Sequence, residues 1–376
     1  MKSKRASACI GIAVVLLVGA ISFGCGSSSH IIGAPHFFLA LDDASGTPLK
    51  NVNVYSVNPV SGALTLATAS AQDIGLDDPS AAVINPKLPV VYFADWYGNI
   101  VSASIDASGR LTQIGTTYNT GYNDFGWVGG LAVTADGKYL YATTDDAYVV
   151  AFAINQTNGT LTHIASDYDT GLTWTGDITI VGNNLYVTEW ETSSYIRVAT
   201  INSDGHLTDN GDLFTSDGDA IWTVQADQSG KWLVIGDEYH NLYVYGIKAD
   251  GTLQTPAVSS LTYYNDTEAP GCNGFGDVRS IAFTHDNKFF YTTDDCNAVH
   301  TLPFNASTGA IGTELTPPVP NQAIDCKVVV DPSDSFVYAA SGDLYGFKRD
   351  KTTGALTQLT GMPTTEQGYP CGLTIF

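Results

Sequence analysis

The chain has 376 residues, of which 38 are Asp or Glu and 16 are Lys or Arg, so its formal charge at pH 7 is −22. Nucleic acid is excluded as a partner, because neutralising phosphates requires clusters of Lys and Arg that this sequence lacks. The acidic balance favours a well-solvated surface, and cation binding is the alternative that it leaves open.

The N-terminal segment has the pattern of an export signal. A basic stretch at residues 2–5 precedes an apolar run over residues 10–23, which is too short and too rich in small residues for a stable membrane span. The run leads into Cys25 and a serine tract at 27–29, a pattern that resembles the cleavage box of bacterial lipoproteins. Residues 1–24 are therefore predicted to be a signal peptide.

Cleavage before Cys25 would make this residue an acylated N-terminus, carrying chains such as palmitate, with residues 25–36 as a tether. The alternative is an ordinary signal, cleaved nearby, that leaves Cys25 as a plain cysteine. Loss of residues 1–24 removes three cations and no acid, which takes the formal charge to −25. Gly26 replaces the Asp that is associated with inner-membrane retention, so we expect an exported lipoprotein of the outer membrane or cell surface of a bacterium.

One turn recurs along the rest of the chain. It has the form Ser/Asp/Asn/Thr-Gly-x-Leu/Ile, with its glycine at positions 62, 109, 159, 205, 251, 309 and 354, so consecutive copies lie 45 to 58 residues apart. Such a turn between alternating apolar runs is a strong hairpin signal.

Residues 128–167 show the repeated unit most clearly. Its four strand-like runs are VGGLAVT, YLYATT, AYVVAFAIN and TLTHIASD, and the second and third alternate apolar and polar residues with a period of two. Four antiparallel strands in a unit of this length form a propeller blade. Seven units therefore predict an all-β, seven-bladed β-propeller.

The ring is predicted to close through its last strand. The chain enters the repeat at the second strand of a blade, FFLALDD (37–43), and ends on an isolated inner strand, CGLTIF (371–376). That last strand must complete the first blade, which removes the exposed edges of an open sheet. Residues 37–376 are then a single domain.

Four cysteines lie in the last third of the chain, and an even number in an exported protein predicts two disulfides. The inferred blade layout places all four near one face. The predicted pairs are Cys272–Cys296 and Cys326–Cys371, with Cys296–Cys326 as the main rival.

The repeats resemble a known family. The segments SIAFTHDNKFFYTTDD (280–295) and TLPFNASTGAI (301–311) look like the lactonase-type seven-bladed propellers, which include bacterial 6-phosphogluconolactonases and fungal carboxymuconate cyclases. The resemblance covers all seven units, but its pattern is shared by many propellers. It therefore implies the fold strongly and lactone hydrolysis weakly.

In a propeller, ligands bind where the loops between blades converge. Here every blade offers an acid in the turn between its second and third strands, often beside an aromatic residue. Turn chemistry by itself explains most such positions, because Asp is a preferred turn residue. The alternative is a face that binds a cation or a cationic ligand, with Trp96, Trp190 and Tyr239 as platforms. The candidate ligand-face residues are Asp95, Trp96, Asp145, Asp146, Glu189, Trp190, Asp237, Glu238 and Asp294.

A second set of acids lies in the crossings that lead into the inner strands. These side chains are expected to ring the channel mouth, where several carboxylates could bind Ca²⁺, a cation that takes six to eight oxygen ligands. The candidate metal ligands are Asp177, Asp219, Asp277 and Asp325.

The family resemblance also implies catalytic positions. Arg279 matches the family's arginine, and Asp295 is a shortened substitute for its acid. Ser280 replaces one family histidine and Gly129-Gly130 the other, which leaves His240 as the histidine expected on the ligand face. Arg279, Asp295 and His240 are thus the catalytic residues if the protein is an enzyme, although Arg279 beside Asp277 is equally explained as an ion-paired channel residue.

Two hypotheses remain. The favoured one is a non-catalytic, lipid-anchored envelope propeller that binds an envelope partner, a glycan, a small molecule or a cation through its acidic loop face. The alternative is a lactonase-like hydrolase, related to the 6-phosphogluconolactonases, whose active site has diverged.

Overall fold

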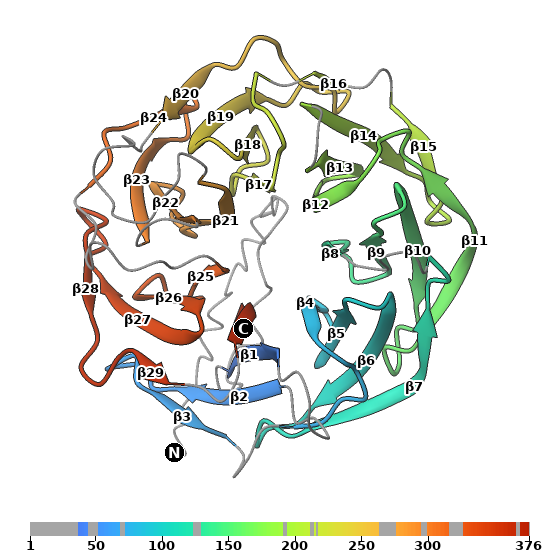
Figure 1. Ribbon diagram of the computed structural model, residues 1–376, viewed down its shortest axis with the longest axis horizontal. Helices are drawn as coiled ribbons and strands as arrows, with labels where there is room; N and C mark the ends of the chain where they lie inside the picture. Colours follow the sequence, from blue (N-terminus) through green and yellow to red (C-terminus); the bar gives the residue numbers. More distant parts are fainter. Residues whose placement is uncertain are drawn as a thin grey trace, which may run out of the picture.

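The computed structural model describes residues 37–43, 52–67, 72–122, 129–190, 194–210, 214–215, 217–262, 276–294, 299–315, 326–365 and 369–375. Within these ranges all regular structure is β, and the strands form seven antiparallel sheets arranged in a ring (Figure 1). This part of the chain has no helix that is long and apolar enough to cross a bilayer. The predicted seven-bladed propeller is confirmed.

The blades are numbered from the N-terminus, and the strands of each are named from the inner edge of its sheet to the outer edge. Blade one consists of β30 (Tyr369–Ile375), β1 (Phe37–Asp43), β2 (Val52–Val57) and β3 (Leu64–Leu66). Blade two consists of β4 (Pro79–Ile84), β5 (Val90–Asp95), β6 (Asn99–Ile105) and β7 (Leu111–Asn119). Blade three consists of β8 (Leu131–Val133), β9 (Tyr139–Thr143), β10 (Tyr148–Ile154) and β11 (Leu161–Asp169).

The remaining blades follow the same order. Blade four consists of β12 (Thr175–Val181), β13 (Asn184–Glu189), β14 (Tyr195–Ile201) and β15 (Leu207–Asp209), with β16 (Phe214–Thr215) also on β14. Blade five consists of β17 (Thr223–Ala226), β18 (Trp232–Gly236), β19 (Asn241–Gly246) and β20 (Ser259–Thr262). Blade six consists of β21 (Val278–Phe283), β22 (Phe289–Asp294), β23 (His300–Asn305) and β24 (Ala310–Ile311). Blade seven consists of β25 (Val328–Val330), β26 (Phe336–Ser341), β27 (Asp343–Arg349) and β28 (Leu356–Gln358), with β29 (Thr364–Thr365) also on β27.

The last strand closes the ring as predicted. β30 pairs antiparallel with β1, from Phe38 opposite Ile375 to Asp43 opposite Tyr369, with a register shift after Leu41. Blade one is therefore built from both ends of the described chain, with β30 as the inner strand of its sheet.

The core lies between the blades. Seven apolar clusters fill the seven interfaces, each formed by the facing sides of two neighbouring sheets. At the closing interface, for example, Phe38 and Tyr55 of blade one pack against Phe336 and Tyr338 of blade seven. Alternate residues of each central strand face opposite neighbours, so both faces of a blade are buried and its strands are almost continuously apolar.

In several blades a tyrosine on the second strand is hydrogen-bonded to the next blade. Its phenol donates a hydrogen bond to the carbonyl oxygen of the glycine in the recurrent turn, at distances of 2.7 to 3.1 Å. The pairs are Tyr92–Gly159, Tyr141–Gly205, Tyr186–Gly251, Tyr291–Gly354 and Tyr338–Gly62. The recurrent turn glycines therefore have a second role beyond the turn, because they bring a backbone acceptor to the neighbouring sheet.

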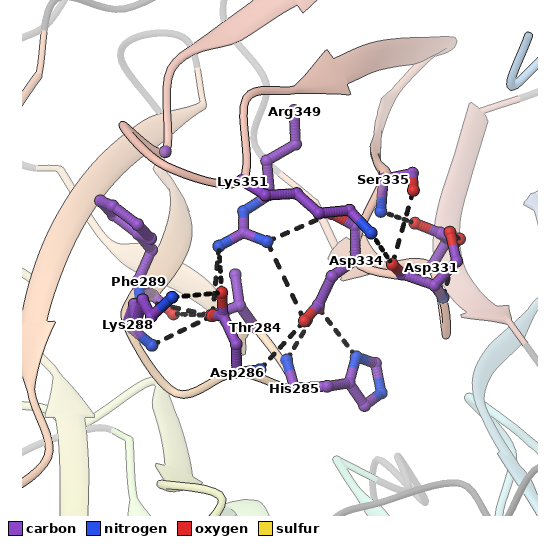
Figure 2. A network of polar contacts seen from close by, with 12 residues as sticks. Thr284, His285, Asp286, Lys288, Phe289, Asp331, Asp334, Ser335, Arg349 and Lys351 are labelled. Atoms are coloured by element: carbon purple, nitrogen blue, oxygen red, sulfur yellow. Dashed lines mark hydrogen bonds and ion pairs between the residues drawn. The ribbon is translucent and has the colours of Figure 1, made fainter.

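A buried ion-pair network joins blades six and seven (Figure 2). The Arg349 guanidinium, fully buried at the end of β27, contacts both carboxylate oxygens of Asp286 at 3.2 Å and donates to the Asp334 carbonyl at 3.1 Å. The Asp334 carboxylate in turn accepts from the backbone N–H and Nδ1 of His285. These residues lie in or beside the turns between first and second strands, at the end of the sheets opposite the turns between second and third strands.

Candidate functional site

The loop face of the ring consists of the turns between second and third strands and the crossings into the inner strands. The acids predicted for its turns are buried rather than exposed: Asp95 and Asp294 are 0% exposed, Glu189 and Asp237 1%, and Asp145 5%. Asp146 and Glu238 are half-buried, and Trp96 is exposed. The sequence therefore places acids at this face, but most of them are directed into the protein.

Two of these acids cap their own turns. Asp95 Oδ1 accepts the backbone N–H groups of Tyr97 and Asn99, and its Oδ2 accepts the Asn99 side chain. Asp237 makes the same three contacts with Tyr239 and Asn241. Burial raises the pKa of both carboxyls, and these hydrogen bonds oppose the rise. At these two positions the geometry is that of turn chemistry.

Three of the chain's six tryptophans gather on blades four and five. Trp174 precedes β12, Trp190 follows β13 and Trp222 precedes β17; we call them the tryptophan cluster. The ring centroids of Trp174 and Trp190 are 5.9 Å apart, and those of Trp190 and Trp222 are 5.1 Å apart. Three separate segments thus form one half-buried aromatic surface.

Arg279 of blade six completes this surface. Its guanidinium carbon lies 4.0 Å from the centroid of the Trp222 ring, and its Nη2 pairs with Asp277 Oδ2 at 2.7 Å. The cation therefore stacks on an aromatic face while its charge is balanced by a neighbouring carboxylate. The structure joins Arg279 to Asp277 and Trp222; the predicted partner Asp295 lies outside the described residues.

Two buried polar atoms beside the cluster have no hydrogen-bond partner among the described residues. Glu189 Oε1 accepts the backbone N–H of Thr173 at 2.9 Å, but its Oε2 accepts nothing from this part of the chain. The Nε1–H of Trp222 likewise has no acceptor within it. Buried polar groups are nearly always paired, so a buried acceptor and a buried donor without partners in this part of the chain indicate a polar ligand or an ordered water.

The predicted metal ligands do not form one group. Asp177 Oδ2 accepts Thr223 Oγ1 at 3.0 Å and so links the inner strands of blades four and five, whereas Asp219 is exposed. Asp277 pairs with Arg279. Asp325 lies outside the described residues, and the residues that are described contain no group of three His, Cys, Asp or Glu side chains that could hold a metal ion.

His240 is buried in a chain of titratable groups. Its Nδ1 lies 3.3 Å from Asp294 Oδ2, and the same oxygen lies 3.0 Å from His300 Nε2. His300 Nδ1 lies 2.7 Å from Glu314 Oε1. His240 and His300 are each 3% exposed, so neither is displayed on the open loop face.

His300 is a residue that the sequence analysis did not single out. Burial lowers its pKa, but hydrogen bonds and charge attraction from Asp294 and Glu314 outweigh burial and raise the pKa to about 9. His300 is the first residue of β23, and its sequence context does not distinguish it from other strand residues.

Cys326 is disulfide-bonded. It lies two residues before β25, at the start of an inner strand as predicted. The side chains of Cys25, Cys272, Cys296 and Cys371 lie outside the described part of the chain, so the pairing and the lipidation stay predictions.

No family model matches the chain. Among solved structures, the periplasmic gluconolactonase of Pseudomonas aeruginosa matches with a TM-score of 0.73 and 15% identity, over 90% of this chain and 98% of that one. A candidate 6-phosphogluconolactonase from Bacteroides uniformis matches with a TM-score of 0.75 and 14% identity, over 91% of this chain and 100% of that one. Another candidate 6-phosphogluconolactonase, from Bacteroides fragilis, matches with a TM-score of 0.71 and 16% identity, over 92% of this chain and 99% of that one. At these identities the likeness is one of fold.

Proposed function

We propose that this chain is a lipid-anchored envelope propeller whose loop face binds a neutral polyhydroxylated ring, such as one sugar unit of a glycan, at the tryptophan cluster. The observation that carries this proposal is the pair of unpaired atoms, Glu189 Oε2 and Trp222 Nε1, beside indole rings that contact each other at a tilt. One sugar hydroxyl can donate to the carboxylate while another oxygen accepts from the indole. The apolar face of a sugar ring would lie on the tryptophans, as amphipathic rings provide contact area with a polar edge.

Other ligand classes fit this surface less well. A cationic ligand would meet the guanidinium of Arg279, which already covers the face of Trp222. An anionic ligand would approach a protein of charge −22, and Asp277 already neutralises Arg279. A hard metal ion requires more oxygen ligands than Glu189 supplies here.

The test is a titration of the purified domain with neutral mono- and oligosaccharides, followed by indole fluorescence and calorimetry. Trp222→Phe keeps an aromatic ring but removes the unpaired donor, so binding should weaken about threefold to tenfold, the worth of one hydrogen bond. Trp232→Phe changes an indole at the start of β18, at the end of the sheet opposite the loop face, and should leave the affinity unchanged. Equal affinities for the wild type and Trp222→Phe, or no binding of any saccharide, would contradict the proposal.

Lactone hydrolysis is a second candidate, favoured by the likeness in fold to a gluconolactonase. A sugar lactone is itself a polyhydroxylated ring, and Arg279 could stabilise the oxyanion that forms when the ring opens. The difficulty is the general base, because the candidate histidine His240 is buried away from the open loop face. We expect no appreciable hydrolysis of 6-phosphogluconolactone by the mature domain. Rapid hydrolysis that Arg279→Ala abolishes would establish the enzyme instead.

The membrane anchor is tested separately from the ligand. Metabolic labelling with palmitate and detergent partitioning should place the wild type with the membrane, and Cys25→Ser should release it or leave its signal uncleaved. A wild type that takes up no lipid and fractionates with the soluble envelope proteins would remove the anchor from the proposal without touching the sugar site.

A further inference from the structure

A short segment at the start of β21, residues 276–278, is hydrogen-bonded to the turn between β18 and β19. The Gly276 N–H donates to the Glu238 carbonyl at 3.0 Å, the His240 N–H donates to the Gly276 carbonyl at 3.0 Å, and the Val278 N–H donates to the Asp237 carbonyl at 2.9 Å. These three hydrogen bonds join blade six to blade five. We call residues 276–278 the strap.

The ring of His240 lies directly on the strap. A Cβ atom at Gly276 would come within 1.4 Å of His240 Cε1, so the imidazole occupies the space that any other residue would need. His240 itself has a φ of 58°, a left-handed conformation that is strained for a residue other than glycine. The turn therefore has a backbone conformation that places the His240 ring against Gly276.

The strap also carries the charged part of the ligand surface. Asp277 belongs to it and Arg279 follows it, and this pair holds the guanidinium over Trp222. Any displacement of the strap changes where Arg279 lies relative to the tryptophan cluster.

Behind His240 lie the buried charges that fix its position. Asp294, which stands opposite Val278 in the β21–β22 ladder, lies within contact of both His240 and His300 through one oxygen. Since both ring nitrogens of His300 face carboxylates, both must donate, and the ring carries a positive charge. Glu314, on the far side of His300, is the most exposed of the four, at 21% of its side chain.

We propose that His300, acting through Asp294 and His240, is a positioning residue for the loop-face ligand site, because it holds the strap and hence Arg279 against Trp222. This inference rests on the proposed function for its ligand readout, but its structural readout does not. The charges that face His300 are Asp294 from β22 and Glu314 beyond β24, and Asp294 also faces His240 from the β18–β19 turn.

The experiment uses the mature domain and needs no ligand for its first measurement. Near-ultraviolet circular dichroism at about 290–300 nm, where indoles dominate the signal, reports the packing of the tryptophan side chains. Arg279→Met defines the signal of a cluster without its guanidinium. His300→Gln, which removes the charge, should show the Arg279→Met signal already at pH 7, whereas His163→Gln on the outer strand β11 should match the wild type.

The wild type provides a version of the test without any substitution. A histidine with a pKa raised to about 9 keeps its stabilising charge below the unfolded value near 6.5 and loses it as the pH rises through 9. The indole signal should therefore change with a midpoint near pH 9 in the wild type and stay flat in His300→Gln. A wild-type signal that is constant between about pH 7 and 10, or an unaltered spectrum in a folded His300→Gln protein, would overturn the proposal.

Saccharide affinity supplies the second measurement. Arg279→Met and His300→Gln should each weaken binding by a similar factor, about tenfold, and the double variant should be no weaker than either, because coupled residues are not additive. Strict additivity would assign His300 a separate, merely structural role. If no saccharide binds even the wild type, the proposed function fails, while the circular dichroism experiment still decides the positioning role.

Discussion

The phenol of Tyr338 donates a hydrogen bond to the carbonyl oxygen of Gly62 at 2.7 Å, and this contact ties blade seven to blade one. Burial raises the pKa of Tyr338, so its phenol remains a neutral donor well into alkaline solution. Gly62 has a φ of 72°, and a Cβ there would come within 2.4 Å of the Phe336 ring. The recurrent glycine therefore allows both the turn and the approach of the next blade.

Tyr338→Phe should lower the free energy of unfolding by about 1–2 kcal/mol, because it leaves a buried carbonyl without its donor. Tyr141→Phe removes the same contact between blades three and four and should cost a similar amount, whereas Tyr97→Phe, at an exposed tyrosine, should cost little. Chemical denaturation measures all three. Equal stability of Tyr338→Phe and the wild type would show that water replaces the phenol as the donor to the Gly62 carbonyl.

Arg349→Met should destabilise the protein by about 3 kcal/mol, since removing one partner of a buried ion pair leaves the other charges uncompensated. Asp286 and Asp334 would then repel each other at the interface between blades six and seven (Figure 2). Arg110→Met, at an exposed arginine, is the matched control. A thermal transition that moves equally in both variants would contradict the assignment.

The same network predicts the acid limit of stability. Burial alone would raise the pKa of Asp286, but hydrogen bonds from Thr284 and Lys288 and the charge of Arg349 outweigh it and hold the pKa low. The pKa of Asp334 is also lowered, by its contacts with His285 against the effect of burial. A lowered pKa contributes stability above the unfolded value, which is lost as the pH falls through the folded value. We expect unfolding to begin below about pH 4, and at a higher pH in Arg349→Met, when the transition is followed by circular dichroism.

Deletion of residues 371–376 should abolish folded, soluble protein. It removes most of β30 and leaves β1 and the inner edge of blade one without a partner. Expression yield, gel filtration and the thermal transition measure the effect. A truncated protein that melts like the full chain would mean that β30 adds nothing to closure.

Non-reducing peptide mapping should find Cys326 joined to Cys371, with Cys296 as the competing partner. Cys326 is disulfide-bonded at the start of β25, and β30 of the next blade is the neighbouring inner strand. Reduction should lower stability by about 2–4 kcal/mol. Recovery of Cys326 as a free thiol from protein kept under non-reducing conditions would reject the bond.

The fold could be predicted because its determinants are local and repeated. Each turn glycine and each alternating strand is visible in the sequence, and the unmatched strand at each end implies how the ring closes. β8 begins at Leu131, although residues 129–130 were also predicted to belong to the inner strand. The Gly130 N–H donates to the Thr143 hydroxyl, while the Gly130 carbonyl still accepts the Thr143 N–H. Residue 128 lies outside the described part of the chain.

The site was less predictable because its parts come from distant segments. The sequence singled out Trp190 and Arg279, but not Trp174 or Trp222, which join them only in the folded ring. Asp177 could not be told from a metal ligand, since its contact with Thr223 crosses between blades. His300 was missed because only the fold places two carboxylates around it.

The pairing of Phe38 with Ile375 also constrains when the protein can fold. Blade one cannot be completed until almost the whole chain is present, so its sheet keeps an open edge until the last strand has been synthesised. The entropic cost of closing so long a loop is small, because it rises by only about 0.6 kcal/mol for each doubling of the loop length. Kinetically it is slow, because contacts distant in sequence form late and expose strand edges in the meantime. The interval before closure is therefore the period in which this chain most needs protection from aggregation.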